Sequence, residues 1–229
     1  MNDITWSITI TFGIYLLCTF IQKKTKLSVL NPLLISSIFI MIILIVFKID
    51  YHRYKTGASF ITFLIGPATV SLAVPLYQNL ELLKKNWKIV LLTIFSGVIV
   101  HALVIGVLAV ILRLSDAMVA TVVPKSVTTA IALDISKGLS GIENLTVAIV
   151  IITGILGAVV SPFIFKVFKI NSPIAQGLSL GSAAHAVGTS RAAELGEVHA
   201  SMATLSLIIT GITTVIISPL VYNIIVSLF

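Results

Sequence analysis

The residue with the clearest chemical potential is a lysine in the middle of an apolar block. Lys125 lies inside the block 118–136, well away from the polar residues at either end. An unpaired ammonium in such surroundings is strongly disfavoured. We therefore expect Lys125 to face a cavity or an anionic ligand. The alternatives are a structural ion pair, with Asp134 or Glu194 as the partner, and a turn of the chain that is exposed to water.

A proline directly before this lysine predicts a break in the helix. Pro124 lacks a backbone N–H and disfavours helical geometry at the preceding residue. A second half-helix would begin near Ser126, with its free N–H groups and positive end close to Lys125. Together with the hydroxyls of Thr128 and Thr129, this arrangement suits a small carboxylate. The alternative is a simple proline kink whose hydroxyls bond back to their own helix.

A second polar segment is centred on a histidine. Gly181 and Gly188 allow either a close approach of backbones or an unwound stretch, and we expect the helix to break at Gly181. His185 and Thr189 are four residues apart, on one helical face. His185 can donate a hydrogen bond or carry a proton near neutral pH, and Ser182 and Gly188 would complete this side of the binding site. The alternative is a histidine that only joins two helices.

Other polar side chains have simpler interpretations. Arg191 and Glu194 are three residues apart and predict either an ion pair at the membrane surface or a gating pair. His101 lies in an apolar segment, where we expect it to pack. The short polar turn that contains Glu197 and His199 lacks the paired-histidine spacing of a metalloprotease. No sequence motif of a hydrolase or a phosphate-binding loop is present, so we expect neither an enzyme nor a metal or cofactor site.

The composition requires a membrane. Of 229 residues, 58% are hydrophobic and only 10% are charged, which leaves too little polar surface to coat a soluble globule. The apolar runs are continuous and rich in Leu, Ile and Val, which predicts helices rather than alternating strands. The net charge of +7 comes mainly from basic residues at the ends of these runs, where they anchor topology and bind lipid headgroups. The single cysteine, Cys18, excludes an intrachain disulfide.

The elements that must position these groups are eight hydrophobic segments in an all-α integral membrane protein. We expect them at residues 4–22, 31–49, 60–77, 87–112, 118–136, 143–167, 174–195 and 198–229. Lysines rather than a small-residue cleavage site follow the first segment, so we expect it to be retained as a span. The connections are short, which predicts one membrane domain over residues 1–229. The fourth, sixth and eighth segments are the most apolar and would form the scaffold.

An internal repeat relates parts of the chain at a fixed offset of 57 residues. The sequence Ile-Ile-Thr-Gly-Ile occurs at residues 151–155 and 208–212, and Ser161-Pro162 matches Ser218-Pro219. A further shift by the same 57 residues aligns Pro67 with Pro124, which predicts a third helix break. The predicted units are approximately 58–114, 115–171 and 172–228, with Thr128 in register with His185. Repeated units with interrupted helices are typical of transporters. The units are parallel if the broken segments span the membrane and inverted if they are re-entrant, and the positive charges do not orient the chain.

At its polar segments the chain resembles the LrgB/CidB family of bacterial membrane proteins. The matching stretches are NPLL at 31–34, PATVSLAVPLY at 67–77, PKSVTTAIA at 124–132 and GLSLGSAAHAVGTSRAAELGE at 177–197. One departure is Ala184, where the family often has a hydroxyl residue before the histidine.

The resemblance implies two descriptions of function. One is a holin-like or antiholin-like regulator of murein hydrolase activity, autolysis and programmed cell death. The other is a carrier of small monocarboxylates such as pyruvate or glycolate, as in the related plastidic glycolate/glycerate translocator, acting with a small LrgA/CidA-type membrane partner. The buried Lys125 and the two interrupted segments favour the carrier. We expect a homodimer in the bacterial cell membrane, with a proton or cation as the coupled ion.

Overall fold

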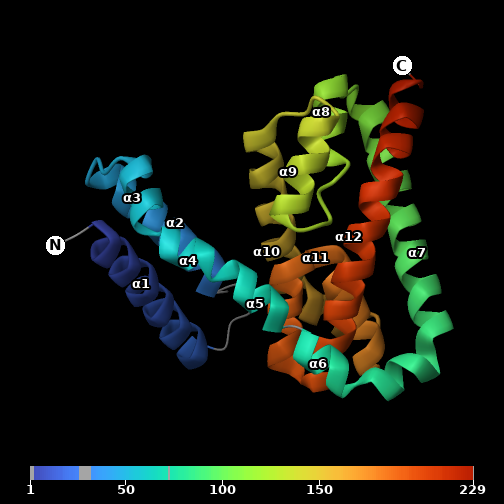
Figure 1. Ribbon diagram of the computed structural model, residues 1–229, viewed down its shortest axis with the longest axis horizontal. Helices are drawn as coiled ribbons and strands as arrows, with labels where there is room; N and C mark the ends of the chain where they lie inside the picture. The colour runs from blue at the N-terminus through green and yellow to red at the C-terminus, as the bar shows by residue number, and fades with distance from the viewer. Residues whose placement is uncertain (1–2, 26–31, 72, 229) are drawn as a thin grey trace. The chain divides into compact units, whose positions relative to one another are not determined.

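The computed structural model describes residues 3–25, 32–71 and 73–228, and every regular element in these residues is a helix (Figure 1). The chain divides into two compact units, Met1–Ala73 and Val74–Phe229, which are described separately. The first contains α1 (Asp3–Thr25), α2 (Pro32–Val46), α3 (Tyr51–Gly57), α4 (Ser59–Phe63) and α5 (Ile65–Ser71). After α6 (Ala73–Gln78), the second contains α7 (Leu80–Leu112), α8 (Asp116–Val122), α9 (Thr129–Gly138), α10 (Glu143–Val167), α11 (Pro173–Leu195) and α12 (Glu197–Val226).

Four of the described helices are long and apolar enough to cross a membrane. They are α1, α10, α12 and the part of α7 from Lys84 to Leu112. The all-α prediction is confirmed for the described residues, and α10 has the predicted bounds 143–167. The prediction of eight hydrophobic segments is not confirmed, because the other predicted segments form shorter or interrupted helices.

The third predicted segment, 60–77, shows how the structure differs from the sequence expectation. It forms the short helices α4, α5 and α6 in place of one long helix. Pro67 lies in the first turn of α5, where a missing N–H costs no helical hydrogen bond. The break falls at Leu64, between α4 and α5, three residues before the predicted position.

The first unit is held together by contacts between the start of α1 and the helix α3. Arg53 and Asp3 form an ion pair of 2.6 Å, and the Thr11 hydroxyl lies 2.7 Å from the Tyr54 hydroxyl. Trp6 meets the Tyr54 ring edge-on, with 6.5 Å between ring centroids. These polar contacts fix one end of α1, while α2 packs along it.

In the second unit, α11 packs along α12 and against α10, and α7 runs beside α12 (Figure 1). One core cluster joins the first parts of α7 and α12 to α11 through Val90, Ile94, Leu178 and Met202. A separate cluster joins the later parts of α7 and α12 to α8 through Ile105, Ala109, Val119, Val123 and Ile225. The helices α7, α11 and α12 therefore surround the space between the two clusters.

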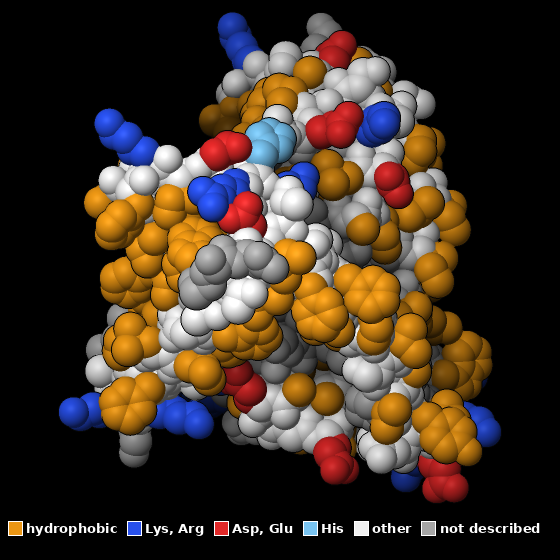
Figure 2. Space-filling view, turned by 60° about the vertical axis from the view of Figure 1, so that its left-hand side comes forward, with side chains coloured by type: hydrophobic (Ala, Val, Ile, Leu, Met, Phe, Trp, Pro, Cys, Tyr) orange, Lys and Arg blue, Asp and Glu red, His pale blue; other side chains and the backbone are white. Residues whose placement is uncertain are grey.

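The outer surface is apolar, as a lipid-facing surface must be. Hydrophobic side chains cover much of the face shown in Figure 2. On α7, Leu92 is 71% exposed and Ile111 is 68% exposed. A helix of this length with such a face is stable in hydrocarbon because all its internal backbone groups are hydrogen-bonded.

A small network of buried hydroxyls fixes the two half-helices α8 and α9 to α10. The Thr121 hydroxyl donates to Ala117 O and accepts the N–H of Ile142 at 2.9 Å. The hydroxyls of Ser136 and Thr146 lie 2.7 Å apart. The ends of the interrupted segment are therefore held rigidly, which fixes the connection between them.

This network gives a first prediction. Thr121→Val keeps the shape of the side chain but leaves the Ile142 N–H without its acceptor, so we expect a loss of about 1–3 kcal/mol in the free energy of unfolding. Thermal and denaturant unfolding in detergent measure the change. The matched control is Thr19→Val in α1, where the hydroxyl bonds to Tyr15 O in its own helix. Equal stability of the two variants would show that the network contributes nothing.

Candidate binding site

The helix break predicted at Pro124 is present. Helix α8 ends at Val122 and α9 begins at Thr129, three residues later than the predicted start near Ser126. The intervening residues form tight turns, with the Lys125 N–H donating to Val122 O at 3.2 Å. At the start of α9, Thr128 is extended and its side chain does not cap the helix. The first N–H groups of α9 therefore keep the partial positive charge of a helix N-terminus.

Lys125 lies on the wall of a cavity of about 260 Å³ in the second unit. Helices α7, α11 and α12 supply the rest of the wall. The lining residues are Gly97, Val98, Val100, His101, Lys125, Ser126, Ser182, Ala183, Thr210 and Thr214. Liquid water occupies about 30 Å³ per molecule, so this volume accommodates a small organic anion or several waters.

The electrostatics of this cavity favour an anion. Its lining contains an ammonium, an imidazole and four hydroxyls but no carboxylate. Within the described residues Lys125 makes no salt bridge, and the structure shows neither of the predicted partners bound to it. Asp134 is exposed, while Glu194 pairs with Arg191. His101 lies on the lining of the same cavity as Lys125.

Three polar residues of the cavity, His101, Thr210 and Thr214, were not predicted as ligands. His101 was expected to pack, yet its buried Nε2 has no hydrogen-bond partner among the described residues. Thr210 is 3% exposed, and its Oγ1 is also unpartnered in the described part of the chain. The available signal for Thr210 was its place in the repeated Ile-Ile-Thr-Gly-Ile sequence. The available signal for His101 was its polar side chain in an otherwise apolar segment.

The structure places His185 in a different role. Its backbone departs from the helix at φ 40° and ψ −128°, so the break in α11 falls here and not at Gly181 as predicted. Its Nε2 donates to Val150 O of α10 at 3.1 Å, and the Thr189 hydroxyl donates to His185 O at 2.9 Å. Gly188 packs against Leu180 O. These residues shape the kink in α11 and do not line the cavity.

The other predicted site residues divide into two groups. Ser126 and Ser182 line the cavity together with Lys125. Thr128 and Thr129 are half-buried at the start of α9 and are not part of the lining. Thus three of the eight predicted binding residues meet at one place.

Gly181 has a packing role inside α11. A side chain at this position would collide with the backbone of Ala203 in α12, because a Cβ would lie 2.8 Å from the carbonyl carbon. The glycine therefore allows the close approach of α11 and α12 that brings Ser182 to the same cavity as Thr210.

Four of the described helices are long and apolar enough to cross a membrane, and two of them, α7 and α12, line a polar cavity, so the fold is that of a helical integral membrane protein. The sequence matches the LrgB-like family over residues 11–224, and the chain belongs to this family. The antiholin-like protein LrgB of Bacillus subtilis (strain 168) is 34% identical over 215 residues, which cover 93% of each chain. No solved structure matches the chain. The family resemblance inferred from the polar motifs is thereby confirmed.

Proposed function

We propose that this protein carries small monocarboxylates, of the size of pyruvate or glycolate, across the bacterial cell membrane. The observation that supports this most directly is the cavity at Lys125, which is cationic, contains hydroxyls and lacks a carboxylate. A half-buried lysine in a membrane-spanning unit, without an ion-pair partner among the described residues, is costly unless a ligand compensates its charge. A singly charged carboxylate provides that compensation.

In this proposal different polar residues bind different parts of the substrate. The Lys125 ammonium binds the carboxylate, and the hydroxyls of Ser126, Thr210 and Thr214 donate to the carboxylate or to a keto or hydroxyl oxygen beside it. The Ser182 hydroxyl donates to Ser179 O, and its oxygen can accept from a hydroxyl of the substrate. The buried side chain of Val98 adds an apolar surface beside these polar groups. A dicarboxylate would bring a second charge with no cation to receive it, so the site favours monocarboxylates.

The family resemblance extends the proposal to partners. We propose that a small LrgA/CidA-type membrane protein assembles with this chain, which forms a homodimer, and that a proton or cation is coupled to transport. The relative from Bacillus subtilis is described as antiholin-like. On our proposal, any effect on murein hydrolase activity and autolysis follows from movement of a carboxylate across the membrane.

Uptake by purified protein in vesicles tests this function. We expect pyruvate and glycolate uptake to saturate with concentration and to be inhibited by each other but not by a dicarboxylate such as succinate. Vesicles with and without the small partner show whether it is required. Uptake that never saturates, or that passes uncharged sugars equally well, would show a pore or lesion and reject the carrier.

A further inference from the structure

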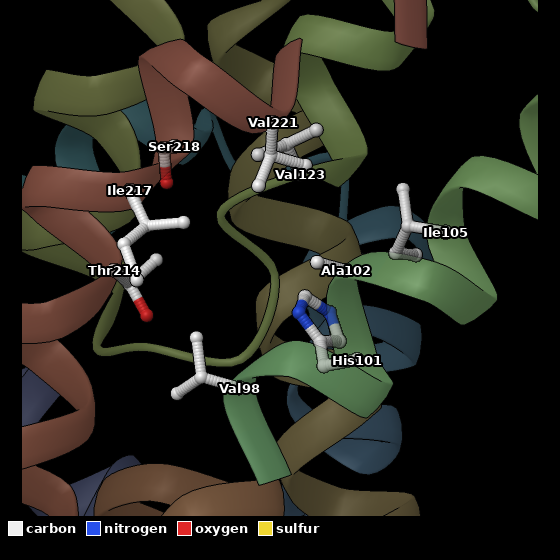
Figure 3. Close-up of a pocket in the computed structure, with 9 residues that line it drawn as sticks. All are labelled: Val98, His101, Ala102, Ile105, Val123, Thr214, Ile217, Ser218 and Val221. Carbon is white, nitrogen blue, oxygen red and sulfur yellow. The ribbon is translucent and has the colours of Figure 1, made fainter. Parts of the chain in front are cut away.

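A second, smaller cavity adjoins the first and shares Val98, His101 and Thr214 with it (Figure 3). Its volume is about 20 Å³. A cavity of about 10–15 Å³ is enough for one water if polar partners surround it. Figure 3 shows the His101 ring directed toward this space from α7, with Thr214 and Ser218 on the facing side of the cavity.

The polar partners come from a stripe on α12. Thr210, Thr214 and Ser218 follow one another at intervals of four residues, so they lie on one side of the helix over about 12 Å. All three are buried, and Ser218 is 2% exposed. The hydroxyl oxygens of Thr210 and Ser218, like His101 Nε2, have no hydrogen-bond partner among the described residues. Buried polar groups of this kind are normally satisfied by water or a ligand.

The repeated dipeptide Ser-Pro occurs in both α10 and α12. Comparison of the two copies shows that an unpartnered serine hydroxyl is not a general property of Ser-Pro in these helices. In α10, Pro162 cannot donate to Ala158 O, and the Ser161 hydroxyl donates to that carbonyl at 3.1 Å. In α12, Pro219 likewise cannot donate to Val215 O, but the Ser218 hydroxyl is unpartnered and faces the small cavity. The Ser218 hydroxyl is thus available to a water.

We propose that Thr210, Thr214 and Ser218, together with His101, form a hydrated path that delivers a proton to the carboxylate cavity. The inference rests on the proposed function. Water in the path relays a proton from the aqueous phase to the His101 imidazole, each water receiving one proton as it passes on another, and the imidazole releases the proton to the aqueous phase on the other side of the membrane. The carboxylate crosses as the anion, with no change in its own bonds.

His101 and Lys125 line the same cavity, and this couples the movement of the proton to the movement of the carboxylate. In the empty cavity a proton on His101 meets the nearby ammonium, and two like charges repel in a low-dielectric site. A carboxylate bound in the same cavity removes this repulsion, so proton binding and anion binding favour each other. Among the described lining residues, Lys125 is the one with a permanent charge. The polar groups that α11 and α12 contribute to the lining are hydroxyls, which do not titrate. His185 also lies near Lys125, but it is bonded to Val150 O.

The test measures carboxylate uptake and proton movement together, in vesicles that contain a trapped pH indicator and receive external pyruvate or glycolate. Protein-free vesicles give the background from passive acid permeation. We expect wild-type protein to move protons with the carboxylate. We expect His101→Gln to reduce the protons moved per carboxylate to background. Ser218→Ala should reduce the ratio in the same way, and Ser161→Ala is the matched control that should retain it.

The outcomes separate this inference from the proposed function. Wild-type vesicles without saturable uptake reject the proposed function. Saturable uptake without proton movement rejects only the path, and so does His101→Gln protein that moves protons as wild type does. If His101→Gln does not fold, Ser218→Ala decides, because a wild-type proton ratio in that variant overturns the proposal. Equal losses in Ser218→Ala and Ser161→Ala would also overturn it, because they would show a general packing effect.

Discussion

At the substrate concentration that half-saturates the wild type, uptake of pyruvate or glycolate is expected to fall close to background in Lys125→Ala. The substitution removes the cation on the cavity lining and leaves the hydroxyls in place. A charge-assisted hydrogen bond contributes about 1.5–3 kcal/mol, so substrate affinity should fall about 10- to 100-fold. The unfolding temperature should remain the same or rise, since an unpaired half-buried charge is removed. Uptake kinetics and thermal unfolding of the same preparation measure both effects.

Two further variants complete this experiment. Lys125→Arg retains the positive charge and should keep part of the uptake, although the guanidinium group of arginine is larger than an ammonium and fits the cavity less well. Lys137→Ala removes an exposed lysine from the last turn of α9 and should transport as the wild type does. Wild-type uptake by Lys125→Ala would remove the basis of the proposed carrier function.

The largest loss of stability is expected in Gly181→Ala. The added methyl group meets the Ala203 backbone, which cannot move without displacing α12 from α11. Overpacking of this kind costs about 1–3 kcal/mol, and contact with backbone places this site at the upper end. Ser182 is the next residue, so uptake per folded molecule should fall as well. Unfolding in detergent and vesicle uptake are the measurements.

Gly138→Ala is the matched control for this substitution. A Cβ at Gly138 meets nothing within 4 Å, so the variant should be as stable as the wild type. If Gly181→Ala unfolded at the same temperature as this control, the close approach of α11 and α12 would not matter to stability.

The sequence was most informative where composition alone decides the structure. Long apolar runs predicted α10 within its observed bounds, since a continuous run in lipid has no alternative to a helix. Pro124 predicted the interruption after α8, because the missing N–H is a local property. The short helices α4, α5 and α6 were not predicted, because an apolar run by itself does not mark where a helix inside it ends.

The binding site was predictable only in part, for a physical reason. Local features marked Lys125, Ser126 and Ser182, which do line the cavity. The assignment of His185 as a ligand depended on its side-chain direction, and the kink turns that ring toward Val150 O. His101 and Thr210 were missed because their exposure to a cavity arises from the packing of α7 against α12. The repeat register itself stays a prediction, although Thr128 and His185, its paired residues, both depart from helical geometry.

The position of Pro219 between the two core clusters of α12 has a mechanical consequence. Before it, Met202 fixes the helix to α11, and after it, Ile225 fixes the helix to α8 and α7. A proline lowers the resistance of a helix to bending at that point. On the proposed carrier function, the parts of α12 before and after Pro219 tilt relative to each other, and this residue is the hinge at which the cavity opens to one side of the membrane or the other.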